Sequence, residues 1–381
     1  MKLPDESIRI KNSIKILDLL IKQNMSRIDL SNETGLTKTT VGEIVRGFLN
    51  MGLIEEEKII PRGVGRPSIN LKIVNDFAYV IGIGIMRDGI NGCIIDAQGE
   101  IIYKKDIFFT KNISYINTLY NFIDDLVKEA KMKNKKVKAI SFGVPGPLDT
   151  TKGIIKQPPK LPEFVNYPLV DNITKKYKVS AYIENDADMG AIGERYYGSG
   201  DDLDSFIYIL YDKGIGAGIM INDQLYHGIN GYAGEIGHTL VFSKEKLKYF
   251  EDEYGLDRIL ERFSQELSYQ IIDINEIRNF SKEKERLIYN IQEELVINLS
   301  IIILNLIHYF GISNILIGGK AKFFGENLLL SLRKYVNKYL FHEHKVNIVF
   351  SDLDDYAISL GAAKYGLIKF LQEQIMKINS K

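Results

Sequence analysis

Residues 79–91, YVIGIGIMRDGIN, are the stretch that decides the fold. An apolar run contains Gly82 and Gly84, and a second apolar run, GINGCIID, begins at Gly89. Two apolar runs joined by a short glycine-containing turn predict a β-hairpin. ATP-binding folds place such a turn against the phosphates of the nucleotide, with a carboxylate just after the first glycine to organise Mg²⁺. No acid follows Gly82 at that point, so the hairpin predicts a fold and leaves its purpose open.

The chain beyond this hairpin repeats the same unit. The strand GEIIYKKDIFF (99–109), an amphipathic helix at 116–133 and the strand VKAISFGVPG (137–146) follow the first hairpin. A second strand, glycine turn and strand lie in SFIYILYDKGIGAGIMINDQLYHG (205–228). This order predicts an α/β chain with the two-lobed actin-like ATPase (ribonuclease H-like) fold. The expected parts are a first lobe at 76–187, completed by a C-terminal helix at 355–381, and a second lobe at 188–354 that also carries a dimerisation surface.

Three stretches are expected to line a cleft between the lobes, because ligands bind where strand ends face it. They are FGVPGPLD (142–149), YIENDADMGAIGERYYG (182–198) and GINGYAGEIGHTLV (228–241). Carboxylates, amides and imidazoles recognise neighbouring sugar hydroxyls, and a carboxylate can also take the proton of a hydroxyl that attacks ATP. The pattern predicts a sugar site formed by Gly146, Asn185, Asp186, Glu235 and His238.

Each of these side chains also has a simpler explanation. Asp186 is a possible helix N-cap, Glu235 a possible partner of a lysine, and His238 a possible core histidine. Their occurrence together on glycine turns, in this order, favours the sugar site over the separate structural roles.

The first seventy residues predict a helix-turn-helix. Apolar residues recur at helical spacing in SIKILDLLIKQN (13–24). Ser26 is a plausible N-cap for a helix at 27–33, Gly35 supplies a turn, and Thr37 caps a second helix at about 38–50. The second helix of such a motif enters the major groove of DNA. The predicted DNA-contacting residues here are Arg27, Thr37, Lys38, Thr39, Thr40, Glu43 and Arg46.

Two alternating segments after Gly52, LIEEEKII and INLKIV, predict the strands of a wing. Between them lies PRGVGRPS, in which glycines flank Arg62 and Arg66. Such arginines can enter a narrow, A·T-rich minor groove. The winged helix-turn-helix is therefore expected at 1–75. The alternative is a helical hairpin for protein contact with a merely solvated basic loop.

Composition excludes several classes of protein. The chain has 381 residues, formal net charge of zero and one cysteine, Cys93. No global charge attracts it to nucleic acid or membrane, and an internal disulfide or a cysteine-rich zinc site is impossible. No signal sequence or membrane span is expected, and the apolar stretch LVINLSIIILNLIHYFGI is interpreted as a buried helix. We therefore expect a cytoplasmic protein without a membrane partner.

The motifs in order resemble the ROK family (repressors, open reading frames and kinases), and the N-terminal unit resembles its sugar-responsive repressor branch. The matching segments are SFGVPGPLD, IENDADMGAIGE, GYAGEIGHTLV, ILIGGKA and DDYAISLGAAKYGL. The resemblance implies that Asn185, Asp186, Glu235 and His238 contact a sugar, with Asp186 at the catalytic-base position of the kinases. It places GVPG beside the sugar and a further sugar-contacting acid near Asp257.

The chain departs from the family's kinases where ATP binds. The first phosphate turn lacks the family's Asp-x-Gly-Gly-Thr, Asp212 replaces a small residue of the second, and Lys320 interrupts the adenosine-side Gly-Gly-Gly. An anion about 4 Å from a phosphate costs on the order of 4 kcal/mol at an effective dielectric constant near 20. Many members also carry a zinc-binding cysteine cluster after Glu-x-Gly-His. Residues 242–260 have no cysteine, so no metal is expected, and packing of Leu247, Tyr249, Phe250, Tyr254 and Leu256 is expected to order that loop.

These features predict a repressor of a carbohydrate-utilisation operon with no catalytic residues and no cofactor. Its expected partners are a pseudo-palindromic double-stranded DNA operator, a hexose, pentose or derivative as effector, and a second copy in a homodimer or tetramer. Two alternatives remain open. One is an ATP-dependent hexose kinase with an appended DNA-binding domain. The other is a DNA-binding regulator that receives its signal from a protein partner and has a vestigial sugar cleft.

Overall fold

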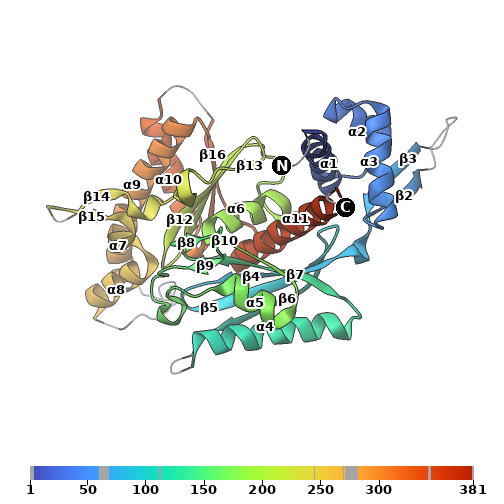
Figure 1. Ribbon diagram of the computed structural model, residues 1–381. Helices are drawn as coiled ribbons and strands as arrows, with labels where there is room; N and C mark the ends of the chain where they lie inside the picture. Colours follow the sequence, from blue (N-terminus) through green and yellow to red (C-terminus); the bar gives the residue numbers. More distant parts are fainter. Residues whose placement is uncertain are drawn as a thin grey trace.

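The computed structural model describes residues 4–59, 68–110, 113–243, 245–268, 270, 282–341 and 345–379. A small N-terminal head lies against two five-stranded sheets, with helices between and outside the sheets (Figure 1). The head consists of α1 (Pro4–Lys22), β1 (Met25–Ser26), α2 (Arg27–Thr34), α3 (Lys38–Asn50), β2 (Ile54–Ile59) and β3 (Ser68–Ile73).

The two short helices of the head begin and end where the sequence predicts. The Ser26 hydroxyl accepts from the Asp29 amide and the Asp29 carboxylate accepts from the Ser26 amide, which is a capping box. Gly35 ends α2 in the left-handed conformation, with φ of 69°. The Thr37 hydroxyl then accepts from the Thr40 amide and starts α3. The predicted helix boundaries are confirmed to within one residue.

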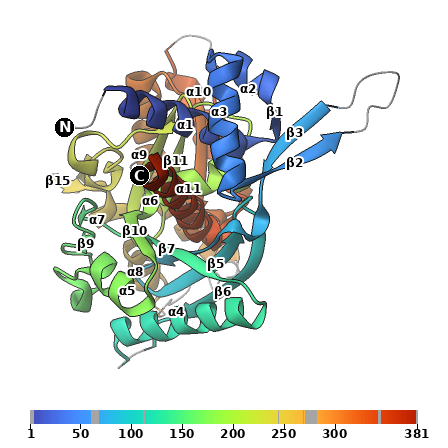
Figure 2. The ribbon, with the colours of Figure 1, turned by 45° about the vertical axis from the view of Figure 1, so that its right-hand side comes forward.

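The two strands that follow α3 are antiparallel, in the sheet order β1-β3-β2. Figure 2 shows this hairpin extending away from α3 and from the two large sheets. The segment that joins β2 to β3 carries Arg62 and Arg66, and both arginines lie outside the described residues.

The first large sheet has the order β10-β7-β4-β5-β6, antiparallel from β4 to β6 and parallel from β4 through β7 to β10. Helices α4 (Tyr115–Met132) and α5 (Leu169–Tyr177) pack on one of its faces. Its strands are β4 (Tyr79–Ile85), β5 (Gly89–Asp96), β6 (Ile101–Phe108), β7 (Val137–Val144) and β10 (Ser180–Asn185). A small pair, β8 (Leu148–Asp149) and β9 (Ile154–Ile155), follows β7.

The second sheet has the order β13-β12-β11-β16-β17. Helices α8 (Leu256–Leu267), α9 (Lys282–Phe310) and α10 (Glu326–Tyr339) cover its outer face. Its strands are β11 (Phe206–Tyr211), β12 (Ile215–Ile221), β13 (Gln224–Leu225), β16 (Asn314–Gly319) and β17 (Asn347–Phe350). The hairpin of β11 and β12 matches the second strand-turn-strand unit that the sequence predicts.

Helices α6 (Asp186–Tyr197) and α11 (Ala357–Asn379) lie between the two sheets. They cross closely because glycines face the partner helix. A Cβ on Gly361 would lie 1.7 Å from the Met189 carbonyl oxygen, and one on Gly193 would lie 2.1 Å from that of Ala357. The crossing therefore requires glycine at both positions, and it fixes the start of α11 against the middle of α6.

The head shares a hydrophobic core with the first sheet and α11. Leu17 and Val45 of the head belong to the same buried cluster as Val80 of β4 and Leu367 of α11. The last residue of α1, Lys22, also forms an ion pair of 2.9 Å with Asp223, in the turn between β12 and β13 of the second sheet. The head therefore contacts both halves of the larger unit.

The long apolar helix α9 packs into the core of the second sheet, where Leu295, Leu299 and Ile303 are fully buried. By length and composition, Tyr289–Phe310 could cross a membrane, and half of its most apolar window is buried in the structure. This burial agrees with the interpretation of the stretch as a core helix.

Candidate functional site

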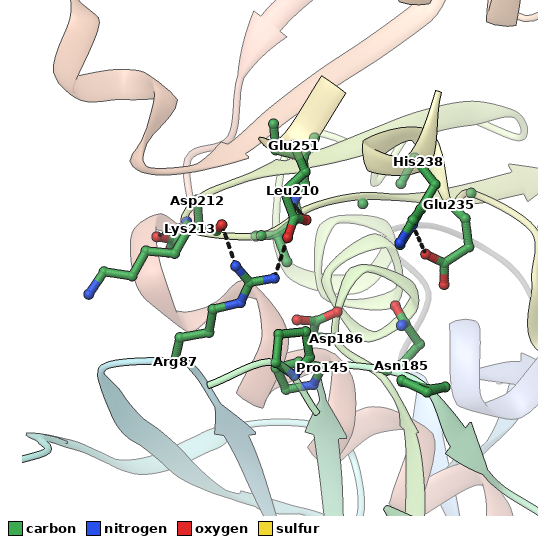
Figure 3. Close-up of a pocket in the computed structure, with 18 of the residues that line it drawn as sticks. Arg87, Pro145, Asn185, Asp186, Leu210, Asp212, Lys213, Glu235, His238 and Glu251 are labelled. Carbon is green, nitrogen blue, oxygen red and sulfur yellow. Dashed lines mark hydrogen bonds and ion pairs between the residues drawn. The ribbon is translucent and has the colours of Figure 1, made fainter. Parts of the chain in front are cut away.

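A cavity of about 680 Å³ lies between the lobes and is lined from both sides. The first lobe contributes Arg87, Gly146, Asn185 and Asp186, and the second contributes the segment from Leu210 to Ala217 and the loop that ends at His238. Figure 3 shows the side chains of Asn185 and Asp186 extending from the first lobe toward Glu235 and His238. Five of the six residues assigned to sugar binding from the sequence line this one cavity: Gly146, Asn185, Asp186, Glu235 and His238.

Asn185 and Asp186 stand where β10 ends and α6 begins. The side-chain oxygen of Asn185 accepts from the Ala187 amide at 2.9 Å and the Asp188 amide at 3.5 Å, so Asn185, not Asp186, is the N-cap. The Asn185 side-chain NH₂ is left available to the cavity. One carboxylate oxygen of Asp186 accepts from the Ala187 amide at 2.8 Å. Burial raises the pKa of Asp186 to about 7.

Glu235 and His238 lie in a loop that is packed tightly onto β12. Gly234, with φ of 80°, approaches so closely that a Cβ would lie 1.8 Å from the Ala217 carbonyl oxygen. The Glu235 carboxylate and the Nδ1 atom of His238 are 3.2 Å apart. The His238 side chain is 64% exposed, so it is not a core histidine, and the partner of Glu235 is this imidazole instead of a lysine.

Gly146 keeps space open between these groups. A Cβ at this position would lie 3.4 Å from the side-chain nitrogen of Asn185 and 3.9 Å from a carboxylate oxygen of Glu235. A donor and an acceptor therefore converge beside one backbone segment that has no side chain. A small polyhydroxylated molecule could contact both groups there.

Asp257 does not belong to this group. It lies in the first turn of α8, forms an ion pair with Lys160, and is absent from the cavity lining. The expected packing of the 242–260 loop is also only partly correct. Phe250, Tyr254 and Leu256 are buried, whereas Leu247 and Tyr249 are exposed. The last two lie on β15 (Lys246–Tyr249), which among the described strands pairs with β14 (Leu240–Ser243) alone, and this two-stranded hairpin leaves both side chains accessible.

The side of the cavity beside the second glycine turn contains two residues that sequence reasoning missed. The Arg87 guanidinium donates to the Glu251 carboxylate at 2.6 Å and to the Lys213 carbonyl oxygen. The other carboxylate oxygen of Glu251 accepts from the Ile215 amide at 2.8 Å. Arg87 follows β4 in the first lobe, and Glu251 lies in α7 (Phe250–Tyr254) of the second. This interlobe ion pair, Arg87–Glu251, crosses the cavity (Figure 3).

The charges around this turn are numerous and only partly balanced. Burial, with a smaller effect of the Asp88 charge, raises the pKa of Asp212 to about 6. Lys213 lies 3.3 Å from Asp88, and Lys320 lies 2.7 Å from Asp355. Each lysine thus has a carboxylate partner other than Asp212.

On the head, the start of α3 is accessible. The exposed residues of this segment include Thr37, Lys38, Thr39, Glu43 and Arg46, whereas Thr40 is half-buried. The hydroxyls of Thr37 and Thr40 are 2.9 Å apart. Arg27 is tied to the β2–β3 hairpin by a 2.6 Å ion pair with Glu56. The structure therefore brings Lys38, Thr39, Glu43 and Arg46 to one accessible helix surface, with Arg27 engaged elsewhere.

The sequence profile of the ROK family matches residues 80–367, which covers the cavity and both large sheets. The chain belongs to the ROK family. The xylose repressor of Caldicellulosiruptor bescii is 27% identical over 378 residues, covering 93% of this chain and 94% of that protein. The xylose repressor of Bacillus subtilis is 30% identical over 285 residues, covering 71% of this chain and 74% of that protein.

Solved ROK structures share the fold. A ROK family transcriptional regulator, a homolog of the Escherichia coli MLC protein, aligns with a TM-score of 0.80 and 21% identity over 97% of this chain and 99% of its own. A ROK family glucokinase from Streptomyces griseus, in complex with glucose and AMPPNP, aligns with a TM-score of 0.64 and 21% identity. That alignment covers 76% of this chain and 99% of the glucokinase. The larger unit thus has a fold that occurs in both regulators and kinases.

Proposed function

We propose that this protein is a sugar-responsive transcriptional repressor of a carbohydrate-utilisation operon. The observation that carries the proposal is the convergence of Gly146, Asn185, Asp186, Glu235 and His238 on one interlobe cavity. These residues come from three separate segments of the chain. The side chains of Asn185, Asp186, Glu235 and His238 offer donors and acceptors to sugar hydroxyls, and Gly146 leaves space for the ligand. The repressor names of its relatives support the same function.

The effector is a sugar small enough for the cavity, and D-xylose is the first candidate because two relatives are named xylose repressors. Asp186 and Glu235 accept hydrogen bonds from neighbouring hydroxyls, and the Asn185 amide donates one. N-acetylglucosamine is the second candidate, from the name of a further relative, the N-acetylglucosamine repressor.

The head (1–75) is the DNA-binding domain in this proposal. The N-terminal residues of α3 enter the major groove of the operator, and the β2–β3 hairpin follows the adjacent backbone as a wing. Lys38 and Thr39 are the main base-reading candidates because they are exposed at the start of α3. Arg62 and Arg66, which lie outside the described residues, are the minor-groove candidates.

The protein acts in the cytoplasm as a homodimer, with the interface on the second lobe (188–354). Exposed apolar side chains on the outer helices support an interface there; they include Ile301 and Leu330. A twofold dimer binds a pseudo-palindrome, so operator half-sites are expected about 10 bp apart or a multiple of that spacing.

The ion pair Arg87–Glu251 and the buried Asp212 disfavour the kinase alternative. Arg87 lies beside Gly214, where its guanidinium would be 2.8 Å from a Cβ, so the second glycine turn is already contacted by a protein side chain. A triphosphate would have to displace that ion pair and approach Asp212. In this proposal the first lobe (76–187, with 355–381) and the second lobe close on a sugar and not on ATP.

The test uses the purified full-length protein and DNA from upstream of the neighbouring sugar genes. We expect specific binding in a fluorescence-anisotropy assay, and loss of binding when D-xylose or another sugar of a panel is added. ADP release from ATP, Mg²⁺ and any sugar of the panel would instead establish the kinase. A sugar at 100 times its Kd should stabilise the chain by about 2.7 kcal/mol. If no sugar of the panel raises the melting temperature while the protein still binds the operator specifically, the regulator that senses a protein partner would be favoured.

A further inference from the structure

A cluster of potential metal ligands lies outside the set of residues proposed to bind sugar. It consists of Glu184 at the end of β10, Asp188 in the first turn of α6, and His227, which follows β13. One potential ligand atom from each residue lies within 4.8 Å of the others. Asn185 and Asp186 occupy the positions between the two acids, but their side chains line the cavity and those of Glu184 and Asp188 do not. The cluster is therefore a second group of polar side chains at the same strand-helix junction.

The carboxylates of Glu184 and Asp188 are buried and have few hydrogen-bond or ion-pair partners. Glu184 is 6% exposed and Asp188 is 3% exposed. One oxygen of Glu184 accepts from the Asn185 amide at 3.0 Å. Among the described residues, no hydrogen bond within 3.5 Å reaches the other oxygen of Glu184 or either oxygen of Asp188. His227 is the only described cationic side chain within 4 Å of either acid, and Lys369 adds a more distant positive charge near Glu184. Buried carboxylates without partners are costly unless they are protonated or a cation lies between them, and one cation shared by both acids would satisfy both.

The distances fit a shared ion better than direct pairs. The Nδ1 atom of His227 is 3.6 Å from a carboxylate oxygen of Asp188 and 3.8 Å from one of Glu184. Both distances exceed that of a hydrogen bond. Two ligands that each lie about 2.0–2.2 Å from one zinc ion at tetrahedral angles are separated by roughly 3.5 Å. The His227 side chain is 44% exposed, which gives an ion a path to the two buried oxygens.

We infer that Glu184, Asp188 and His227 bind a divalent transition-metal ion, with Zn²⁺ as the best fit. One imidazole and two carboxylates suit zinc, and they leave a position for water. This inference departs from the absence of metal that the sequence predicts, which concerned the cysteine-free segment 242–260. The ion would be held by a different set of residues on a different element.

The proposed ion would connect the two lobes next to the sugar cavity. Glu184 and Asp188 belong to the β10–α6 junction, whereas His227 begins the loop that continues to Glu235. The Ala233 amide donates to the His227 carbonyl oxygen at 3.1 Å and closes the intervening turn. Binding of His227 to an ion shared with Glu184 would therefore restrain the base of this loop.

The experiment measures the ion directly and needs neither DNA nor sugar. The full-length protein is stripped with EDTA, and Zn²⁺ is titrated in competition with a chromophoric chelator. We expect one ion per chain, and His227→Ala or Asp188→Asn should weaken its affinity by about 10-fold or more. His308→Ala is the matched control, since His308 is an exposed histidine on α9 far from the cluster in sequence; it should leave the affinity unchanged.

Two results would overturn the inference. One is an unchanged zinc affinity in His227→Ala. Because the His227 side chain is partly exposed, this variant is expected to fold even if Asp188→Asn does not, and circular dichroism checks that it has folded. The other is loss of the ion in His238→Ala with retention in His227→Ala, which would place the ion at the Glu235–His238 pair. An anomalous-scattering peak at the zinc edge between Glu184, Asp188 and His227 would confirm the site.

Discussion

Asp186 is the residue that most directly links the cavity to the proposed function. It lines the cavity, its neighbour Asn185 and not Asp186 caps α6, and its second carboxylate oxygen makes no hydrogen bond among the described residues. The side chain is therefore positioned for a ligand and is not required to start the helix.

The substitution Asp186→Asn should shift the sugar response to higher sugar concentrations and preserve operator binding. A hydrogen bond to a charged group contributes about 1.5–3 kcal/mol, so sugar affinity should fall by roughly 10- to 150-fold. The measurement is operator release against sugar concentration by fluorescence anisotropy. Asp257→Asn is the matched control, because Asp257 lies outside the cavity; operator release by Asp186→Asn at the same sugar concentration as the unmodified protein would refute the site.

Asp212 should make stability depend on pH. Its folded-state pKa, about 6, lies above the ordinary value of 3.8, so the folded chain binds more protons than the unfolded chain between about pH 4 and 6. Stability from this group therefore falls as pH rises through that window. Asp212→Asn should raise Tm at pH 8 more than at pH 5, measured by differential scanning calorimetry. Asp202→Asn, at an exposed position, should change neither value; equal Tm shifts at both pH values in Asp212→Asn would contradict the prediction.

The sequence predicted individual site residues only where those residues lie within a short local motif. Asn185, Asp186, Glu235 and His238 lie in short glycine-containing segments, so their proximity follows once the two-lobed fold is assumed. Arg87 and Glu251 are 164 positions apart, and no local pattern relates one to the other, so only the packing of the lobes reveals their contact. Asp257 lies outside the cavity lining, and no local motif could show this, because the direction of its side chain depends on where α8 begins.

At the scale of elements, α3 presents its first turn to solvent while its other face is buried by Val41, Ile44, Val45 and Phe48. The helix is amphipathic and capped at a defined residue, and these are the features that periodicity and caps reveal in a sequence. Strands β2 and β3 also lie in the two segments for which the sequence predicts strands. The exposure of Leu247 and Tyr249 could not be predicted from the sequence, because periodicity does not show whether another layer of the structure covers a hairpin.

Lys38→Ala should weaken operator binding. A lost base contact costs about 1–3 kcal/mol, and a lost phosphate contact reduces the salt dependence of binding. Anisotropy titrations at several salt concentrations distinguish the two roles. Lys128→Ala on α4, an exposed lysine away from the head, is the control, and equal affinities for both variants would contradict the assignment of α3 as the recognition helix.

The ion pair Arg87–Glu251 joins the turn after β4 to α7 across the cavity. Its side chains are only 10% and 25% exposed, so solvent screens the pair less than it screens surface pairs. A double-mutant cycle with Arg87→Ala and Glu251→Ala, followed by urea denaturation, should give a coupling of about 0.5–3 kcal/mol. Additive effects of the two substitutions would show that the pair does not link the lobes energetically.

At the scale of the whole molecule, the head and the first lobe share one buried cluster. Leu17→Ala in α1 should destabilise the chain by about 2–5 kcal/mol, and hydrogen exchange should accelerate in β4 and α11 as well as in the head. Leu126→Ala on α4 packs on the opposite face of the first sheet, so it should leave exchange in the head unchanged. Acceleration confined to residues 4–50 in Leu17→Ala would show that the head is energetically independent.

The contact between α1 and α11 also limits how regulators of this architecture can recombine. A head transplanted from another protein at residue 75 would meet Leu367, Phe370 and Leu371 of α11 with side chains shaped for a different surface. Chimaeras made at that boundary should therefore recover solubility and operator specificity only when the donor's C-terminal helix is transferred together with its head.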